Sequence, residues 1–403
     1  MINLEVPEKF VPLVDQAHMV AVEVLRPISR KYDLAEHEYP KELDMLAALI
    51  DGLDDGGNPS GAGAAGASQA KQNGDGGNRN GSNMASVLSI IEMCWGDVGL
   101  LLTLPRQGLG NSAIAAVADD EQKERFAGKW AAMAITEPEA GSDSAAIRTT
   151  AVLDGDEYVL NGEKIYVTSG ERAELVVVWA SLDREVGRAA IKSFVVERSN
   201  PGLKLDRLEH KLGIRASDTA AFILDDCRVP KEDLLGSPEI DSKKGFVGVM
   251  RTFDNTRPLV AGMAVGVARA CLELTRDALV EAGVEVDYDR PANVQHAAAA
   301  ELLELEAEFE ASRLLTMEAA WMADNSKPNS LHASYAKAKA GRSGVDIALR
   351  CIALCGSAGL GEEELLEKWA RDAKILDIFE GTQQIQLLII ARQLLGLSSA
   401  ELK

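Results

Sequence analysis

The sequence "TTAVLDGDEYVLNGEKIYVTSG", residues 149–170, interrupts a chain that is otherwise patterned for helices. Apolar and polar side chains alternate along it, and the turn signals "DGD" and "NGE" divide it into three predicted short strands. The alternation continues in residues 173–183, 190–199 and 219–230. This region therefore predicts an antiparallel β domain of about 100 residues.

Both flanks of this region have the three- and four-residue spacing of apolar side chains that is typical of amphipathic helices. The pattern covers residues 11–32, 84–104, 257–280, 293–323, 331–354 and 382–395. The last four of these segments predict a four-helix bundle. We expect an α+β fold with an N-terminal helical domain (1–125), a middle β domain (126–238) and a C-terminal helical bundle (239–403).

Residues 51–83 lie between the two N-terminal helical patterns and are rich in Gly, Asn, Ser and Ala. A segment of this composition has too few large apolar side chains to bury a core. We expect a flexible surface loop here.

The composition excludes several classes of partner. A net charge of −21 argues against nucleic acid and anionic membrane surfaces. No uncharged apolar run is long enough to span a membrane, and "MINLEVPEKF" lacks the layout of a signal peptide. Five scattered cysteines predict reduced thiols in a cytoplasmic protein. Cys351 and Cys355 lack a nearby histidine, so we expect helix packing there and no metal site.

Residues 108–113, "GLGNSA", fit the spacing of a dinucleotide-binding fingerprint. That fingerprint requires a strand before it and a βαβ unit around it, whereas the proline-containing segment "LLTLPRQ" precedes it here. We interpret the motif as a turn between two helices.

Residues 134–150, "AITEPEAGSDSAAIRTT", combine a proline, a glycine and small hydroxyl residues within a few positions. Such a segment offers backbone N–H groups and hydroxyls without bulk, as a polar heteroaromatic ring or a phosphate requires. The alternative interpretation is an ordinary surface turn that leads into the β domain.

Six segments resemble, in their order and spacing, the motifs of the acyl-CoA dehydrogenases, a family of flavin-dependent enzymes. They are "AITEPEAGSD", "LNGEKIYVTSG", "KLGIRASDT", "CRVPKEDLLG", "FDNTRPLVAG" and "RDAKILDIFEGTQQIQ". The resemblance covers roughly residues 120–403. The first 120 residues agree only in being helical, and the glycine-rich segment is not typical of the family.

The resemblance implies FAD as cofactor. The implied cofactor-binding residues are Met133, Ile135, Thr136, Gly141, Ser142, Tyr166, Val167, Thr168, Thr382 and Gln384. Tyr166 and Thr168 would lie along the isoalloxazine ring, and Thr382 and Gln384 would hold the ribityl and phosphate region. Tyr166 stands where the family usually has tryptophan, a change that keeps an aromatic face.

The resemblance also implies the substrate site and the catalytic base. Ser142, Asp254, Thr256, Arg257 and Gly381 would contact the acyl-CoA, although Asp254 and Arg257 fit a structural pair at a helix start equally well. Glu380 would take the α proton of the thioester while the β hydrogen leaves as hydride to flavin N5.

An apolar surrounding would raise the pKa of Glu380 and make it a stronger base. We expect Ile378, Phe379 and the acyl chain to provide that surrounding. The alternative is that Glu380 is an exposed acid near the positive end of a helix dipole.

Two stretches depart from the family. Glu285, Tyr288 and Asp289 replace an arginine, a phenylalanine and a glycine, and Ala353 and Ser357 replace a glutamine and a glycine. In the family, these positions complete a neighbouring subunit's flavin site. The resemblance therefore leaves two assemblies open, a mixed α2β2 tetramer with a second dehydrogenase-like chain and a homotetramer in which Arg290 or another cation has taken over.

Two functions follow from the resemblance. The first is an acyl-CoA dehydrogenase of fatty acid or lipid β-oxidation that passes electrons to an electron-transfer flavoprotein. The second is an assembly subunit that binds flavin weakly or not at all. An intact "TEPEAGSD" segment together with Glu380 favours the enzyme.

Overall fold

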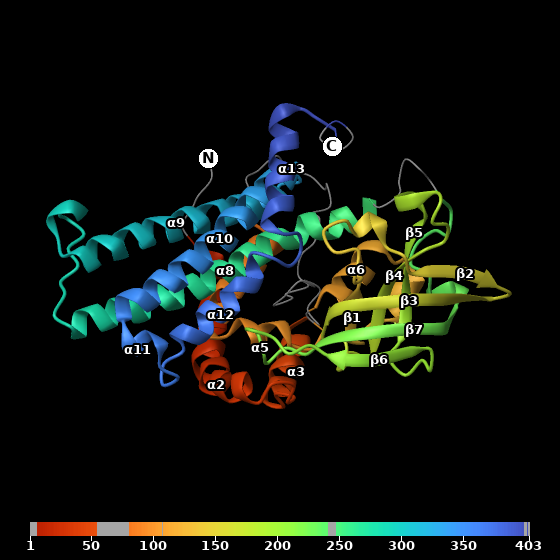
Figure 1. Ribbon diagram of the computed structural model, residues 1–403, viewed down its shortest axis with the longest axis horizontal. Coiled ribbons are helices and arrows are strands. Elements are labelled where there is room, and N and C mark those ends of the chain that lie inside the picture. Colours follow the sequence, from red (N-terminus) through yellow and green to blue (C-terminus); the bar gives the residue numbers. More distant parts are fainter. Residues whose placement is uncertain (1–5, 55–79, 107, 241–246, 399–400, 402–403) are drawn as a thin grey trace.

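The computed structural model describes residues 6–54, 80–106, 108–240, 247–398 and 401. Long helices form one half of the molecule and a curled sheet forms the other, with the N-terminal helices packed beside both (Figure 1). The expected α+β class and the order of helices, sheet and helices are confirmed.

The N-terminal region consists of helices. They are η1 (Glu8–Phe10), α1 (Val11–Val20), η2 (Ala21–Leu25), α2 (Arg26–Leu34), α3 (Glu42–Asp54), α4 (Ser82–Gly96), α5 (Val98–Leu102), α6 (Leu109–Val117) and α7 (Asp120–Arg125). Helices α3 and α4 include residues 51–54 and 82–83, which we expected in a loop. Residues 55–79, the rest of that prediction, lie outside the described residues.

The "GLGNSA" motif forms the start of a helix, and the expected turn between two helices comes before it, between the end of α5 at Leu102 and the start of α6 at Leu109. Gly108 is the extended residue before α6. Gly110 lies so close to β1 that a Cβ there would come within 2.3 Å of the Ala131 carbonyl oxygen. The close glycine contact therefore serves helix-to-strand packing.

The middle region forms a seven-stranded sheet. Its strands are β1 (Ala131–Ala134), β2 (Thr150–Asp154), β3 (Glu157–Thr168), β4 (Leu175–Ser181), β5 (Ile191–Glu197), β6 (Leu203–Leu208) and β7 (Thr219–Pro230). The order is β1-β4-β2-β3-β7-β6, and β5 pairs with β4.

Two details of the predicted sheet are wrong. The sheet is mixed, because β1 and β2 each pair with β4 in parallel. The "NGE" segment is an irregularity inside the single long strand β3, where Gly162 has a φ of 152°. An asparagine–glycine pair suits a bulge as well as a tight turn, and the long partner strand β7 decides between them.

The described part of the C-terminal region contains six α-helices. They are α8 (Val247–Glu281), α9 (Ala297–Asp324), α10 (Ser330–Cys355), α11 (Ser357–Leu360), α12 (Leu366–Leu376) and α13 (Gln383–Leu395). Helices α8, α9 and α10 pack side by side, with α4 and α12 against them. The segment that we expected as the fourth bundle helix, α13, contacts α10 but projects away from the bundle (Figure 1).

Residues Thr256–Glu281 of α8 are long and apolar enough to cross a membrane by length and composition alone. However, 83% of the apolar window is buried inside the protein, which is typical of a core helix. Met263 of this helix belongs to the same core as Ile91 of α4 and Met317 of α9.

Candidate active site

Glu380 lies in the short turn between α12 and α13. The turn is left-handed, because Glu380 has a φ of 53° and Gly381 a φ of 96°. A Cβ on Gly381 would lie 2.4 Å from the amide nitrogen of Gln386, so only glycine fits without displacement. The carbonyl of Asp377 accepts a hydrogen bond of 3.1 Å from the N–H of Gln383 and closes the turn.

The first residue before α13 is Thr382, whose hydroxyl accepts a hydrogen bond of 3.4 Å from the N–H of Ile385. Thr382 is therefore the N-cap of α13. The interpretation of Glu380 as an exposed helix-start acid does not describe this geometry.

The carboxyl group of Glu380 points inward. Its Oε2 atom is buried and has no hydrogen-bond partner among the described residues. Burial raises the pKa of Glu380, and this effect outweighs the hydrogen bond from the Thr256 hydroxyl and the charges of Lys337 and Arg257. A buried carboxylate with an unpartnered oxygen is a suitable general base.

Lys337 of α10 contacts the turn that carries Glu380. Its side chain is fully buried, and its Nζ donates a hydrogen bond of 2.7 Å to the Gly381 carbonyl oxygen. The amide nitrogen of Gln386 donates to the same oxygen at 3.1 Å. Burial lowers the pKa of Lys337 to about 8, opposed by the charges of Glu380 and Asp377.

A glycine brings α10 close enough for this contact. A Cβ on Gly341 would lie 2.9 Å from the carbonyl oxygen of Leu376, at the end of α12. Lys337 is four residues before Gly341 and therefore lies on the same face of α10. The close approach of α10 to α12 thus brings Lys337 within hydrogen-bond distance of the turn.

The apolar surrounding that we expected around Glu380 stays a prediction. Ile378 is 43% exposed, so solvent reaches part of its side chain. Phe379 packs against the main core. The polar groups that face Glu380 are Thr256 and Arg257 of α8, which are 1% and 3% exposed, together with Lys337.

Thr256 and Arg257 were expected along the CoA path, and their place beside Glu380 follows from the packing of α8 against α10. The expectation for Asp254 falls on a side chain that the structure does not describe.

The two predicted flavin segments lie next to each other. The N–H of Ile165 on β3 donates a hydrogen bond of 2.9 Å to the Thr136 carbonyl, just after β1. The fully buried Lys164 Nζ lies 2.7 Å from a Glu137 carboxylate oxygen, and Glu137 also accepts from the N–H of Thr149 at 3.0 Å. A buried ion pair therefore joins "TEPEAGSD" to "LNGEKIYVTSG".

The side chains proposed for the flavin differ in their exposure. Tyr166 has a φ of 58° and is 63% exposed, so its side chain is accessible to a ligand. Gly141, Ser142 and Gln384 are exposed, whereas Met133, Ile135, Thr136, Thr168 and Thr382 are half-buried. Val167 is fully buried in the sheet core, so any contact with the cofactor falls to its backbone.

Lys337 and Gln386 were missed by the sequence reasoning. The signal for Lys337 was a lysine within "YAKAKAG", where small residues mark a closely packed helix face. Nothing local indicated that Gln386 turns back to the Gly381 carbonyl.

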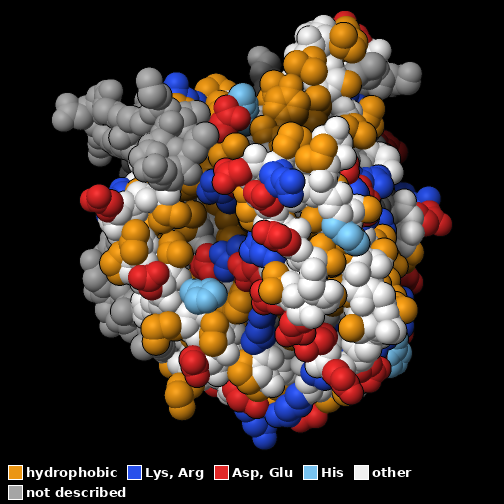
Figure 2. Space-filling model, turned by 90° about the vertical axis from the view of Figure 1, so that its left-hand side faces the viewer, with side chains coloured by type: hydrophobic (Ala, Val, Ile, Leu, Met, Phe, Trp, Pro, Cys, Tyr) orange, Lys and Arg blue, Asp and Glu red, His pale blue; other side chains and the backbone are white. Residues whose placement is uncertain are grey.

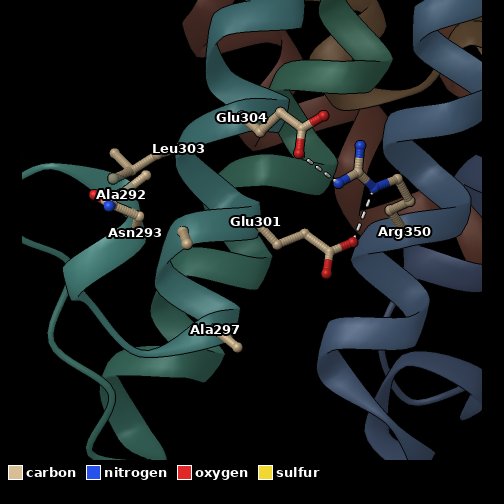
Figure 3. A pocket seen from close by; sticks show the side chains of 8 residues that line it. Ala292, Asn293, Ala297, Glu301, Leu303, Glu304 and Arg350 are labelled. Atoms are coloured by element: carbon tan, nitrogen blue, oxygen red, sulfur yellow. Dashed lines mark hydrogen bonds and ion pairs between the residues drawn. The ribbon is translucent and has the colours of Figure 1, made fainter.

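A surface hollow of about 660 Å³ lies between η7 (Ala292–Val294), α9 and α10 (Figure 3). Arg350, its one basic lining residue, donates to Glu301 at 2.8 Å and to Glu304 at 3.1 Å. None of the residues that surround Glu380 lines this hollow.

One group of side chains among the described residues could present ligand atoms to a metal. Glu36, His37 and His210 place one such atom each within 4.8 Å of one another. The cations Lys211 and Arg172 lie close enough to help burial lower the pKa of His37, and they would repel a metal ion. The group is unrelated to the turn that carries Glu380.

Comparisons with known proteins identify the family of this chain. Family models of the acyl-CoA dehydrogenase middle and C-terminal domains match residues 132–227 and 243–395. The mitochondrial short-chain specific acyl-CoA dehydrogenase of Rattus norvegicus is 33% identical over 98% of this chain and 92% of its own length.

Solved structures give the same assignment. Butyryl-CoA dehydrogenase from Megasphaera elsdenii superposes with a TM-score of 0.83 at 29% identity, over 98% of this chain and 100% of that one. A chain from the structure of the electron transferring flavoprotein of Acidaminococcus fermentans has a TM-score of 0.82 at 30% identity, over 98% and 100%. The protein belongs to the acyl-CoA dehydrogenase family, the FAD-dependent oxidoreductases that act on the CH–CH bond of acyl-CoA thioesters.

Proposed function

We propose that Glu380 is the catalytic base of this dehydrogenase and that the turn around it is the reaction site. The observation that carries the proposal is a buried carboxylate oxygen without a partner, directly before a glycine with positive φ. A neutralised or paired carboxylate would be a poor base, whereas a desolvated one accepts a proton readily.

The residues present fit a flavin. The side chain of Tyr166 is exposed, and Gly141 and Ser142 are also accessible to a ligand. The cofactor supplies the acceptor for the hydride that leaves the β carbon. Thr136 and Thr168 would hold the flavin from the side of the sheet. Thr382 and Gln384, at the start of α13, would hold its ribityl and phosphate region.

The protein groups then act on the α carbon of the thioester. The Glu380 carboxylate takes the α proton, and the electron pair of that C–H bond becomes part of the new double bond. The N–H of Glu380 would donate to the thioester oxygen and stabilise the negative charge that develops there. The absence of a side chain on Gly381 lets the Gln386 side-chain amide lie against the left-handed turn, in the space that a Cβ would fill.

The acyl group that we propose is a short one, and the enzyme would serve β-oxidation in the cytoplasm. Support comes from the curated relatives, which include the short-chain specific acyl-CoA dehydrogenases of rat and of Clostridium acetobutylicum. We propose an electron-transfer flavoprotein as the electron acceptor.

The test compares wild type with Glu380→Gln in single-turnover bleaching of the flavin by butyryl-CoA. The amide cannot accept the proton, so we expect a loss of about 10²–10⁴-fold in rate with flavin content unchanged. Bleaching by the variant at the wild-type rate would show that Glu380 is not the base. Failure of the wild type with every acyl-CoA would contradict the proposed activity itself.

We also propose that the chain assembles as a mixed α2β2 tetramer. Glu285, Asp289, Ala353 and Ser357 are all exposed, so none of them is committed to the core. The neighbouring hollow holds its arginine between two glutamates, and acidic and basic side chains are interspersed over this end of the molecule (Figure 2). A pyrophosphate of a second copy would meet little unpaired positive charge here.

A subunit contact of some kind is supported by α13. Four of its leucines, Leu387, Leu388, Leu394 and Leu395, are between 42% and 65% exposed. Such a group of apolar side chains on a projecting helix favours association.

Mass measurement and flavin counting separate the two assemblies. Co-purification with a second dehydrogenase-like chain, at one flavin for two chains, would support the α2β2 proposal. A homotetramer expressed alone with one tightly bound FAD per chain would contradict it. In that case Arg290, which lies 3.9 Å from Asp287, is the candidate for the replacing cation.

A further inference from the structure

We propose that Lys337 is a positioning residue that holds the Glu380–Gly381 turn and, through its positive charge, sets the proton affinity of Glu380. The proposal rests on Glu380 being the base. It assigns to a residue of the bundle core a task in the reaction, although the residue need not touch the substrate.

The geometry of Lys337 is unusual for a lysine. The side chain is fully buried in α10, yet no carboxylate lies within ion-pair distance of it among the described residues. Its hydrogen bond of 2.7 Å goes to the neutral carbonyl of Gly381. Burying a charge without a paired charge is costly, so a purely structural explanation must account for that cost.

A structural explanation is weakened by Gln386. Its side-chain amide already donates to the Gly381 carbonyl at 3.1 Å, so a neutral donor is in place. A carbonyl oxygen accepts two hydrogen bonds, and a second neutral side chain could make the other one at lower cost. What only a lysine adds is a positive charge next to the base.

The charged and polar groups that face Glu380 and Lys337 come from three helices and their ends. Thr256 and Arg257 face Glu380 from α8, and Lys337 faces it from α10. Asp377, at the end of α12, faces Lys337 together with Glu380 and Arg257. The charge of Lys337, on α10, therefore stabilises the Glu380 carboxylate and offsets part of the desolvation.

The first measurement is an infrared titration of the Glu380 carboxyl group in the flavin-loaded protein, with the band identified by its loss in Glu380→Gln. We expect Lys337→Met and Lys337→Gln both to raise the pKa of Glu380 by about one unit, because each removes the charge. Lys337→Arg keeps the charge and should titrate like the wild type.

The matched control is Lys339→Met. Lys339 lies two residues further along α10 and pairs with Glu308 of α9, so its side chain points to a different neighbour. We expect the Glu380 titration to be unchanged in this variant. Visible absorbance of the flavin and circular dichroism show whether each variant is folded, and if Lys337→Met does not fold, the comparison of Lys337→Gln with Lys337→Arg decides.

The outcomes are distinct. A wild-type titration of Glu380 in Lys337→Gln would mean that a neutral donor suffices, and the proposal would be overturned. If Lys337→Gln and Lys337→Arg shift the pKa equally, packing is responsible and charge is not, which also overturns it.

A kinetic measurement links the inference to the reaction. The pKa of the acid limb of the kcat/KM profile with butyryl-CoA should rise by the same amount, about one unit, in Lys337→Gln. The value of kcat/KM at high pH should change little. If the wild type oxidises no acyl-CoA, the proposed function fails, while the infrared titration still tests the role of Lys337.

Discussion

Lys368 and Lys337 are both fully buried, but their surroundings shift their pKa values in opposite directions. Lys368 of α12 places its Nζ 2.7 Å from Asp97 and 2.5 Å from Asp372. Burial lowers the pKa of Lys368, but the two carboxylates outweigh it and hold the pKa above its usual value. Lys337 has a carbonyl partner instead, and burial lowers its pKa to about 8.

The hydrogen bonding around the two lysines also differs. Asp97 also accepts from the Ser29 hydroxyl and from the N–H of Leu100, and Asp372 accepts from the N–H of Ile214 at 2.5 Å. The network around Lys368 thus ties the N-terminal helices, the segment between β6 and β7, and α12 together. Around Lys337, the Oε2 atom of Glu380 and the Oε1 atom of Gln386 have no partner among the described residues.

Lys164 is an intermediate case. It is fully buried and has one carboxylate partner, Glu137, at 2.7 Å. Burial still lowers its pKa to about 8. Two carboxylates therefore offset the effect of complete burial on a lysine pKa in this protein, and one carboxylate does not. Lys337, which has no carboxylate in ion-pair contact among the described residues, lies at the proposed reaction site.

The largest change in stability is expected on replacement of Lys368, the lysine with two carboxylate partners. Lys368→Met leaves Asp97 and Asp372 buried without their cation, so we expect a loss of about 3–5 kcal/mol in the free energy of unfolding. Urea denaturation of the flavin-loaded protein measures it. A loss below that of Lys337→Met would contradict the assignment of Lys368 as the structural lysine.

The second prediction concerns the pH dependence that Lys337 confers. Between pH 8 and the ordinary lysine value of 10.5, the unfolded chain holds a proton that the folded chain has released. The wild type should therefore gain about 2 kcal/mol of stability relative to Lys337→Met as the pH rises through this window. Parallel unfolding curves at pH 7.5 and pH 10 check this, and an equal pH response of both proteins would exclude a lowered pKa.

A smaller effect is expected from the base itself. The pKa of Glu380 is raised in the folded state, so the wild type loses stability as the pH rises from the ordinary glutamate range through that folded pKa. Glu380→Gln removes this loss and should be more stable than the wild type by about 1 kcal/mol at neutral pH. Thermal unfolding at pH 5 and pH 7.5 tests the sign, and a variant less stable at pH 7.5 would argue that Glu380 is a structural group.

The smallest effect is expected outside both lysine networks. Replacing residues 55–79 by a short Gly-Ser linker should leave the melting temperature and the flavin content nearly unchanged, because their composition offers little to bury. A large loss of either would show that this segment packs on the site or on a partner.

The sequence alone determined the features that arise from neighbouring residues. Period-two and period-three-to-four patterns predicted the sheet between two sets of helices, because secondary structure repeats over a few residues. The motif order around "TEPEAGSD" and Glu380 indicated the family and the base. Even so, the parallel pairing of β1 with β4 was missed, since partners in a sheet are not chosen locally.

Only the tertiary structure decided what surrounds the base. Lys337 and Gly381 are 44 residues apart, and they meet because Gly341 lets α10 approach the end of α12. Ile378, adjacent to the site in sequence, turns to solvent, while Thr256 comes to Glu380 from a distant helix. The desolvation and charge that govern a carboxylate depend on every group that packs near it, and those groups are selected by helix packing.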